Sequence, residues 1–450
     1  MDSRIKRTAI AMAVATALAL PGVALAQATD KEKALEARVA ELEKLVQEMM
    51  ADKKAAPAPA PAAAAPAPAP APAPAVATAN KGSLTVKGFV VASLYAQDAN
   101  FAFGNGQNAE YVSSEYSTDK YTIGGDVRNT RLTLDWQGPN TDDLKFAGLV
   151  ELDFFGGQNA GAFTDEQPVP RLRLAYADIV KGNTTYRIGQ MWSPMFGNVP
   201  VSPTHVAFPL GYGSAGTVGW RYPGLFVYHN FSKTTKLTLA AMRGSWNDAT
   251  EAYGLGAGES GIPQFEARLD FAAGPWNMYV VGHYDEKDCD YANDTAANFN
   301  ECGTGYSSKS LDGSALEFGA KAAFGNFSVQ GNVYQGTAVG HQFAHITQFG
   351  DISGWGGWLQ GSYKFNPTWS GNLFFGMDDP DDDDVFDSGN SRLKSEQIAA
   401  SVMYSKGPYV FGVEWLNSNV TTGSRNSETE VVTETDLDGN QISFSAWYKF

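Results

Sequence analysis

Residues 81–450 form a long series of segments in which apolar and polar side chains alternate, and this pattern restricts the fold more than any other feature. In residues 145–156 (KFAGLVELDFFG), Phe146, Val150 and Phe154 share one face, while Glu151 and Asp153 share the other. A period of two residues is typical of β-strands. Charges on one face suit either a soluble sandwich or a membrane barrel with a wet interior. Alternation alone therefore predicts an all-β fold and leaves both architectures open.

Short turns flanked by aromatic residues favour the membrane barrel. Five such turns alternate with long polar loops, and aromatic rings prefer the headgroup level of a membrane. The turns lie between Trp136 and Phe146, Phe271 and Trp276, Phe324 and Phe327, Phe365 and Trp369, and Tyr404 and Tyr409. Counting strands from this side predicts a 16-stranded antiparallel transmembrane β-barrel with both ends in the periplasm. The expected strands are 83–97, 127–137, 145–156, 170–181, 184–193, 217–231, 236–246, 263–273, 276–286, 314–324, 327–337, 352–366, 369–378, 392–405, 409–419 and 440–450.

Composition agrees with this class of membrane protein. The chain contains 47 Gly, 26 Phe, 19 Tyr and 10 Trp, and its mean hydropathy is only -0.25. After residue 26 the sequence has no apolar run of 18 residues or more, which excludes a membrane-spanning helix. With 33 basic and 49 acidic residues, the chain is a poor partner for nucleic acid.

Three segments precede the barrel. Residues 1–26 have basic residues, an apolar stretch and the Ala24-Leu25-Ala26 cleavage site of a secretory signal peptide. Residues 27–54 are expected to contain an α-helical coiled coil, and residues 55–80 are expected to form an Ala/Pro-rich periplasmic linker. Eight of the 18 residues from Pro57 to Pro74 are proline, which predicts an extended spacer of roughly 55 Å.

The coiled-coil segment leaves its oligomeric state open. Val at position a with Leu at position d favours a dimer, whereas Arg38 and Glu43 match a trimerisation signature, and we favour the trimer. A solvated amphipathic helix is the simpler alternative. The heptad seam consists of Leu35, Val39, Leu42, Val46 and Met49.

Several strands carry a more specific resemblance. They are TRLTLDW (130–136), VELDFFG (150–156), RLRLAYADI (171–179), RIGQMWSPM (187–195) and GWRYPG (219–224), behind a coiled coil and an Ala/Pro spacer. Together they resemble the DcaP-like outer-membrane porins. The resemblance implies a trimeric 16-stranded barrel with a periplasmic coiled-coil extension, associated with dicarboxylate uptake.

The segment from Ser193 to Gly216 is the expected constriction loop. It has four prolines, several apolar residues and no Asp, Glu, Lys or Arg, which is unusual for a loop exposed to water. A 16-stranded barrel has an open lumen, so a loop folded inside it would set selectivity. A plug or a trimer contact is the alternative. The candidate constriction residues are Pro200, Pro203, His205 and Phe208.

Arginines on one half of the barrel are the candidate solute-binding residues. By alternation six of them point inward, while Arg128 and Arg243 fall on the opposite parity. A guanidinium group binds carboxylate or phosphate through two parallel hydrogen bonds, which suits an anionic solute. Nearby inward acids could instead neutralise the arginines. The six candidates are Arg131, Arg171, Arg173, Arg187, Arg221 and Arg268.

Other sequence motifs give less information about function. Cys289 and Cys302 are expected to form a loop-closing disulfide in an oxidising compartment. The run from Asp378 to Asp387 is expected to be a solvated external loop, with Asp381, Asp382, Asp383 and Asp384 as weak candidates for Ca²⁺. No catalytic motif, metal site or cofactor is otherwise expected, so the chain is not predicted to be an enzyme.

The sequence thus predicts a homotrimeric porin of the Gram-negative outer membrane that admits small anions such as carboxylates. Expected partners are membrane lipid, lipopolysaccharide and, through the terminal Phe450, the outer-membrane assembly machinery. The alternative is a structural protein that tethers the membrane to the cell wall through its coiled coil and linker.

Overall fold

The computed structural model describes residues 76–77, 82–102, 110–116, 120–141, 143–156, 168–244, 261–289, 302, 308, 310–346, 350–426 and 428–450. All of them belong to the unit Ala69–Phe450. The expected signal peptide, coiled coil and most of the linker lie outside the described residues. None of the described helices is long and apolar enough to cross a membrane.

Sixteen antiparallel strands close into a barrel. β5 and β6 together form one barrel strand, because both pair with the same edge of β2. The elements are β1 (Val76–Ala77), β2 (Ser83–Gln97), β3 (Ala99–Phe101), β4 (Val112–Glu115), β5 (Thr122–Asp126), β6 (Arg131–Gln137), β7 (Leu144–Gly156), β8 (Val169–Lys181), β9 (Thr184–Trp192), β10 (Arg221–Asn230), β11 (Thr235–Met242), β12 (Gln264–Ala273), β13 (Trp276–Asp288), β14 (Ser310–Phe324), β15 (Phe327–Thr337), η3 (Gly340–Gln342), β16 (Ser353–Lys364), β17 (Trp369–Pro380), α3 (Asp382–Asp387), β18 (Arg392–Lys406), β19 (Tyr409–Arg425) and β20 (Val432–Lys449).

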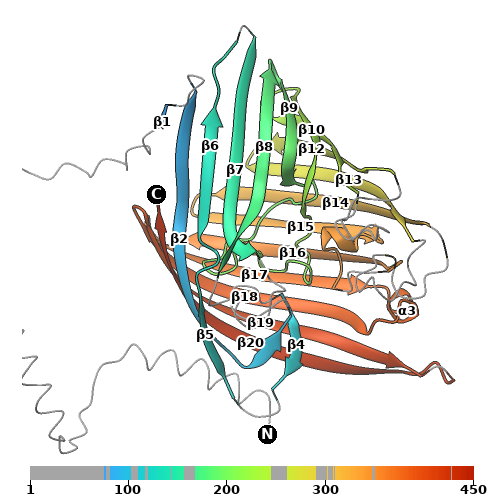
Figure 1. Cartoon of the computed structure of the whole chain (residues 1–450). Helices are drawn as coiled ribbons and strands as arrows, with labels where there is room; N and C mark the ends of the chain where they lie inside the picture. The colour runs from blue at the N-terminus through green and yellow to red at the C-terminus, as the bar shows by residue number, and fades with distance from the viewer. Residues whose placement is uncertain are drawn as a thin grey trace, which may run out of the picture. The chain divides into compact units, whose positions relative to one another are not determined.

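The barrel closes between its first and last long strands. β2 pairs with β20 from Phe89↔Lys449 to Gln97↔Gln441, so the blue strand β2 and the red strand β20 lie side by side (Figure 1). Gly88 and Phe450 exchange two backbone hydrogen bonds of 3.0 Å. Closure removes the free sheet edges that would otherwise leave backbone groups unpaired in lipid.

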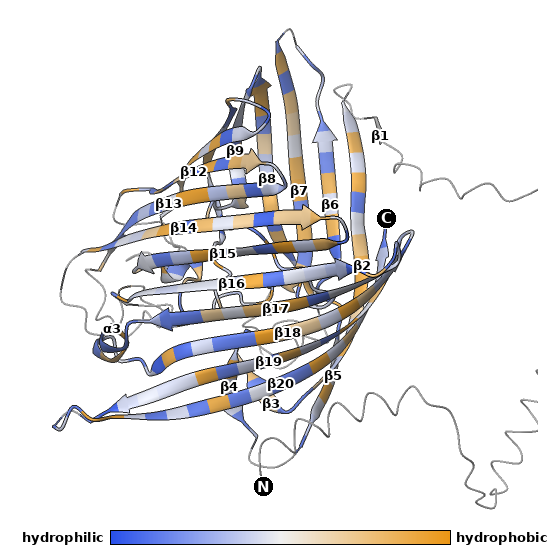
Figure 2. Cartoon of the chain, turned by 180° about the vertical axis from the view of Figure 1, so that it is seen from behind, coloured by the Kyte–Doolittle hydropathy of each residue, from blue (hydrophilic) through white to orange (hydrophobic). Residues whose placement is uncertain are grey.

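Alternating side chains give the barrel an apolar outer face. Figure 2 shows hydrophobic and hydrophilic positions following one another along the strands. Leu225, Leu316 and Leu373 are each about 60% exposed on the outside (58%, 61% and 61%), while their strand neighbours turn inward. Exposed aromatic residues gather beside the short turns, as an interfacial girdle requires. These include Phe231, Trp276, Phe324, Phe327, Phe365, Trp369 and Tyr409.

β2 and β15 match their expected ranges, whereas β14, β19 and β20 extend beyond theirs at the long-loop end by four, six and eight residues. Two other differences matter for function. β10 begins at Arg221 rather than at residue 217, because residues 217–220 remain in the preceding loop. The second barrel strand is interrupted at residues 127–130, where the amide of Thr130 donates to the carbonyl of Val127.

Candidate pore constriction

The loop between β9 and β10, residues 193–220, is folded inside the barrel, and we call it the first inserted loop. Its backbone and side chains bond to inward side chains of β12, β16 and β20. The amide of Met195 donates to Glu266 (2.8 Å), and the amide of Val201 donates to Gln360 (2.7 Å). Further on, Thr204 Oγ1 lies 2.7 Å from Ser443 Oγ. The loop therefore runs from β9 along the inner surface to β20.

The four expected constriction residues lie in this loop and all are buried. Ser202 and His205 both bond to Glu414, at 2.8 and 2.7 Å. The carbonyl of Pro203 accepts a hydrogen bond from the Trp447 indole (2.8 Å). These contacts hold the loop at fixed points on the wall.

A second inserted loop, residues 338–346, packs against the first one. Gln342 connects them: its carbonyl accepts from the Gly219 amide (2.6 Å), and its Oε1 accepts from Ser193 Oγ (3.0 Å). The Phe343 ring lies 4.9 Å from both Tyr212 and Trp220. This loop was not predicted from the sequence, although residues 337–350 also contain no Asp, Glu, Lys or Arg. The same signal would therefore have found it.

Four of the six candidate arginines come together on the wall facing the first inserted loop. Arg171 forms a bidentate pair with Asp153, at 2.9 and 2.6 Å. Arg173 bonds to both Asp153 and Glu151 (2.8 Å each), and Arg131 lies 3.7 Å from Glu151. The acids that could neutralise the arginines are therefore present, but three guanidinium groups share two carboxylates.

The fourth, Arg221, has no carboxylate partner among the described residues. Its guanidinium carbon lies 4.8 Å from the centre of the Trp192 ring and 4.3 Å from that of Trp220. The side chain is buried, and its Nε and Nη1 have no hydrogen-bond partner in the described part of the chain. Aromatic faces attract a cation without neutralising its charge.

The remaining two candidates lie elsewhere. Arg187 is fully engaged with Asp178 (2.7 and 2.8 Å) and stacks on Tyr176. Arg268 bonds to Asp270 and lines a separate cavity of about 340 Å³ beside the short turns. That cavity also contains Lys233, Lys236 and Lys321. It forms a basic pocket apart from the main arginine cluster.

Arg128, which alternation places outside, in fact points inward. The interruption at residues 127–130 adds a residue between two inward positions, as a β-bulge does. Arg128 is buried, forms a bidentate pair with Asp126 (2.8 and 2.6 Å) and lies over the Phe155 ring. The adjacent Asn129 binds the first inserted loop through the carbonyl of Thr204 and the amide of Ala207. Strict alternation of inward and outward side chains predicts the wrong direction for Arg128 because the strand is not continuous.

A carboxyl group near the first inserted loop carries little negative charge. Glu110 is buried, its two carboxyl oxygens have no hydrogen-bond partner among the described residues, and its carbonyl accepts from Ser214 Oγ (2.7 Å). Burial raises the pKa of Glu110 well above its ordinary value. The neutral form of this group therefore adds no countercharge to the arginines.

The remaining sequence candidates lie near the long loops. Cys289 and Cys302 form a disulfide with a Cα–Cα distance of 5.9 Å. Asp381 caps helix α3, and Arg425 bonds to Asp383. Asp381–Asp384 do not form a metal-binding group in the described residues, where the one such group consists of other side chains. Asp378, expected in the external loop, is buried in β17 and accepts a hydrogen bond from Tyr334 (2.8 Å).

A closed 16-stranded antiparallel barrel with an apolar exterior and a loop folded inside defines the porin class of outer-membrane β-barrels. The chain therefore has the fold of outer-membrane channels. Solved structures agree: it is similar to the outer-membrane channel DcaP of Acinetobacter baumannii, with a TM-score of 0.62 and 19% identity over 82% of this chain and 97% of that chain. The fold resemblance expected from the sequence is thus confirmed.

Two further structures share this fold. An anion-selective porin from Comamonas acidovorans matches with a TM-score of 0.54 and 12% identity, covering 82% of this chain and 100% of that one. The trimer form of OmpT from Vibrio cholerae matches with a TM-score of 0.52 and 13% identity, covering 82% and 99%. No protein-family model and no curated protein sequence matches the chain.

Proposed function

We propose that this chain is an outer-membrane porin whose water-filled channel prefers small anions such as carboxylates. The observation that carries the proposal is the excess of positive charge in the arginine cluster on the wall formed by β5 to β10. In this cluster, among the described residues, five guanidinium groups accompany three carboxylates: Arg128, Arg131, Arg171, Arg173 and Arg221 against Asp126, Glu151 and Asp153. Fixed charges at the narrowest part of a pore set ion preference.

The overall acidity of the chain does not oppose this preference. Its formal net charge is -16, but many acids lie in α3 and in the long loops at the other end of the strands from the short turns. Charges further than about 10 Å from the permeating ion are largely screened at ordinary salt concentrations. The proposed preference therefore rests on the arginine cluster and not on the global balance of charge.

The test is the reversal potential of the purified protein in a planar bilayer under a KCl gradient. We expect anion preference in the wild type and a shift toward cations in the double variant Arg131→Ala plus Arg173→Ala. Cation preference in the wild type, or no shift in the double variant, would overturn the proposal. Retention of the folded barrel, checked by its mobility in unheated detergent gels, ensures that the comparison is between pores.

The proposed assembly is a homotrimer in the Gram-negative outer membrane, with the N-terminal extension in the periplasm. The trimer form of one solved structure with this fold supports the assembly. The position of Phe450 at the barrel seam is compatible with its proposed role as the insertion signal. Conductance steps in groups of three would support the trimer, and single steps of equal size throughout would contradict it.

A further inference from the structure

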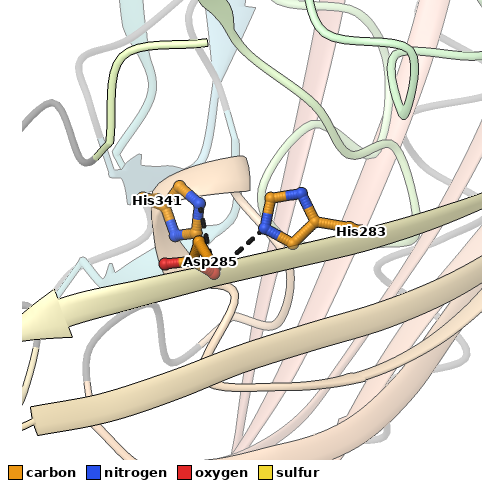
Figure 3. Close-up of side chains that lie close together, drawn as sticks. All are labelled: His283, Asp285 and His341. Atoms are coloured by element: carbon orange, nitrogen blue, oxygen red, sulfur yellow. Dashed lines mark hydrogen bonds and ion pairs between the residues drawn. The ribbon is translucent and has the colours of Figure 1, made fainter. Parts of the chain in front are cut away.

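A cluster of two histidines and one aspartate joins the barrel wall to the second inserted loop. His283 and Asp285 lie two residues apart on β13 and therefore point to the same inner face. His341, in η3, approaches them from the loop (Figure 3). Their side chains are 0–1% exposed. The cluster is separate from the arginines of the proposed constriction.

The distances suit a shared metal ion. Asp285 Oδ1 lies 3.0 Å from His283 Nε2 and 3.8 Å from His341 Nε2, and the three potential ligand atoms all lie within 4.8 Å of one another. An ion held tetrahedrally at 2.0–2.1 Å separates its ligand atoms by about 3.3 Å. Two of the three separations already bracket this value. A small rotation of the His341 side chain would complete the triangle.

A neighbouring carboxylate orients one of the ligands. Glu266 Oε1 lies 2.9 Å from His283 Nδ1, which leaves Nε2 directed at Asp285. Histidines that bind metals usually donate their other ring N–H to a carboxylate in this way, which fixes the ring and increases its basicity. Glu266 also accepts the amide hydrogen of Met195 and so connects the cluster to the first inserted loop.

The local charge balance favours a cation. Two carboxylates, Glu266 and Asp285, face one ammonium group, Lys287, whose Nζ lies 2.6 Å from Asp285 Oδ2 and 2.7 Å from the carbonyl of Ala338. Lys287 binds the second carboxylate oxygen and leaves Oδ1 facing the histidines. With both imidazoles neutral, the group has an excess of negative charge. A proton held by His283 between the two carboxylates is the competing explanation.

We propose that His283, Asp285 and His341 bind a divalent transition-metal ion of the Zn²⁺ type through Nε2, Oδ1 and Nε2, with water as the fourth ligand. Nitrogen and carboxylate ligands in this number are typical of such ions. Bound there, the ion fastens the second inserted loop to β13. Because that loop packs on the first one through Gln342, the site stabilises the arrangement of both loops.

The experiment measures Zn²⁺ binding and thermal unfolding of the detergent-solubilised protein after it has been stripped with EDTA. We expect one Zn²⁺ per chain and a rise in melting temperature with excess Zn²⁺, because a ligand that binds only the folded state stabilises it. His341→Gln and His283→Gln should each weaken binding at least tenfold and abolish the rise. His229→Gln, which removes a histidine of β10 outside the cluster, should change neither.

Unchanged Zn²⁺ affinity in His341→Gln and His283→Gln would place the ion elsewhere, for example on the acidic residues of α3, and would overturn the proposal. Absence of binding by the folded wild type would do the same and would favour the protonated His283. If the variants fail to fold, the visible absorption spectrum of Co²⁺ added to the wild type tests the proposal instead. A spectrum typical of four-coordinate Co²⁺ with nitrogen and oxygen ligands would support the proposed site. A spectrum typical of six-coordinate Co²⁺ would refute it.

Discussion

The guanidinium group of Arg221 lies against the indole of Trp220, 4.3 Å from the ring centre, where β10 leaves the first inserted loop. This is the one arginine of the cluster that is held by aromatic rings without a carboxylate partner in the described residues. Its position combines a guanidinium group, burial and, among the described residues, N–H groups without a hydrogen-bond partner. Such a group is suited to bind the carboxylate of a passing solute.

We predict that Arg221→Gln shifts the reversal potential toward cations and weakens channel block by a small dicarboxylate roughly tenfold or more, since charge-assisted hydrogen bonds contribute about 1.5–3 kcal/mol. Arg425→Gln is the matched control. It removes the same charge at the far end of β19, where Arg425 bonds to Asp383 and lies 3.6 Å from Asp387. Equal shifts in the two variants would exclude a specific role for Arg221.

Asp153→Asn should change selectivity in the opposite direction. Asp153 is fully buried and accepts hydrogen bonds from both Arg171 and Arg173. Removing its charge leaves both guanidinium groups less neutralised, so anion preference should increase while the melting temperature falls. Breaking a buried ion pair typically costs about 3–5 kcal/mol.

Asp143→Asn provides the comparison for Asp153→Asn, because Asp143 forms an exposed pair with Lys181 at 3.3 Å. It should leave both selectivity and melting temperature almost unchanged. A shift of Asp153→Asn toward cations would show that this carboxylate does not neutralise the pore arginines.

Gly216→Ala should displace the first inserted loop. Gly216 has a φ of +87°, and a Cβ atom there would lie 2.3 Å from the carbonyl carbon of Gly357 on β16. Since backbone atoms of a barrel strand cannot move aside, the loop must shift. We expect a changed single-channel conductance and larger current fluctuations in a barrel that still folds.

Gly407→Ala is the control for backbone conformation alone. Gly407 also has a positive φ, +58°, but nothing lies within 4 Å of the added Cβ atom. This variant should lose about 1–2 kcal/mol of stability from the left-handed conformation and keep the wild-type conductance. Wild-type currents in Gly216→Ala would mean that the loop does not define the pore.

Acidification should loosen the second inserted loop. Burial lowers the pKa of His345 to about 4 from its ordinary value of 6.5. The neutral imidazole contacts the hydroxyl of Tyr334 (3.2 Å) and the carbonyl of Gly336 (3.3 Å), and Tyr334 also bonds to Asp378. In the released loop the His345 imidazole binds a proton more tightly than in the packed loop. The packing of the loop is therefore fully stable above pH 6.5, and its free energy of stabilisation falls by up to about 1.4 kcal/mol per pH unit as the pH decreases toward 4.

Hydrogen–deuterium exchange of residues 338–346, corrected for intrinsic pH effects, measures this loosening. Protection should decrease between pH 6.5 and 4.5 in the wild type and vary much less in His345→Gln. Protection that stays constant over this range in the wild type would show that His345 does not control the loop.

Sequence reasoning predicted the barrel well because the physics of a membrane strand is local. A strand with lipid outside and water inside must alternate, and its short turns need aromatic neighbours. The ranges expected for β2 and β15 therefore match the structure, and the count of sixteen strands is confirmed. The same rule failed at Arg128, because the break between β5 and β6 at residues 127–130 changes which side chains face inward.

The sequence by itself determined the strands, their inward and outward faces, and a loop without charges that is unsuited to water. Only the tertiary structure decided which arginines are neutralised and which are not. Glu151 and Asp153 meet Arg131, Arg171 and Arg173 through strand register, whereas Arg221 meets two indoles at the edge of an inserted loop. The path of such a loop depends on contacts with strands more than 100 residues away, as between Ser202 and Glu414. Local alternation carries no information about contacts of that range.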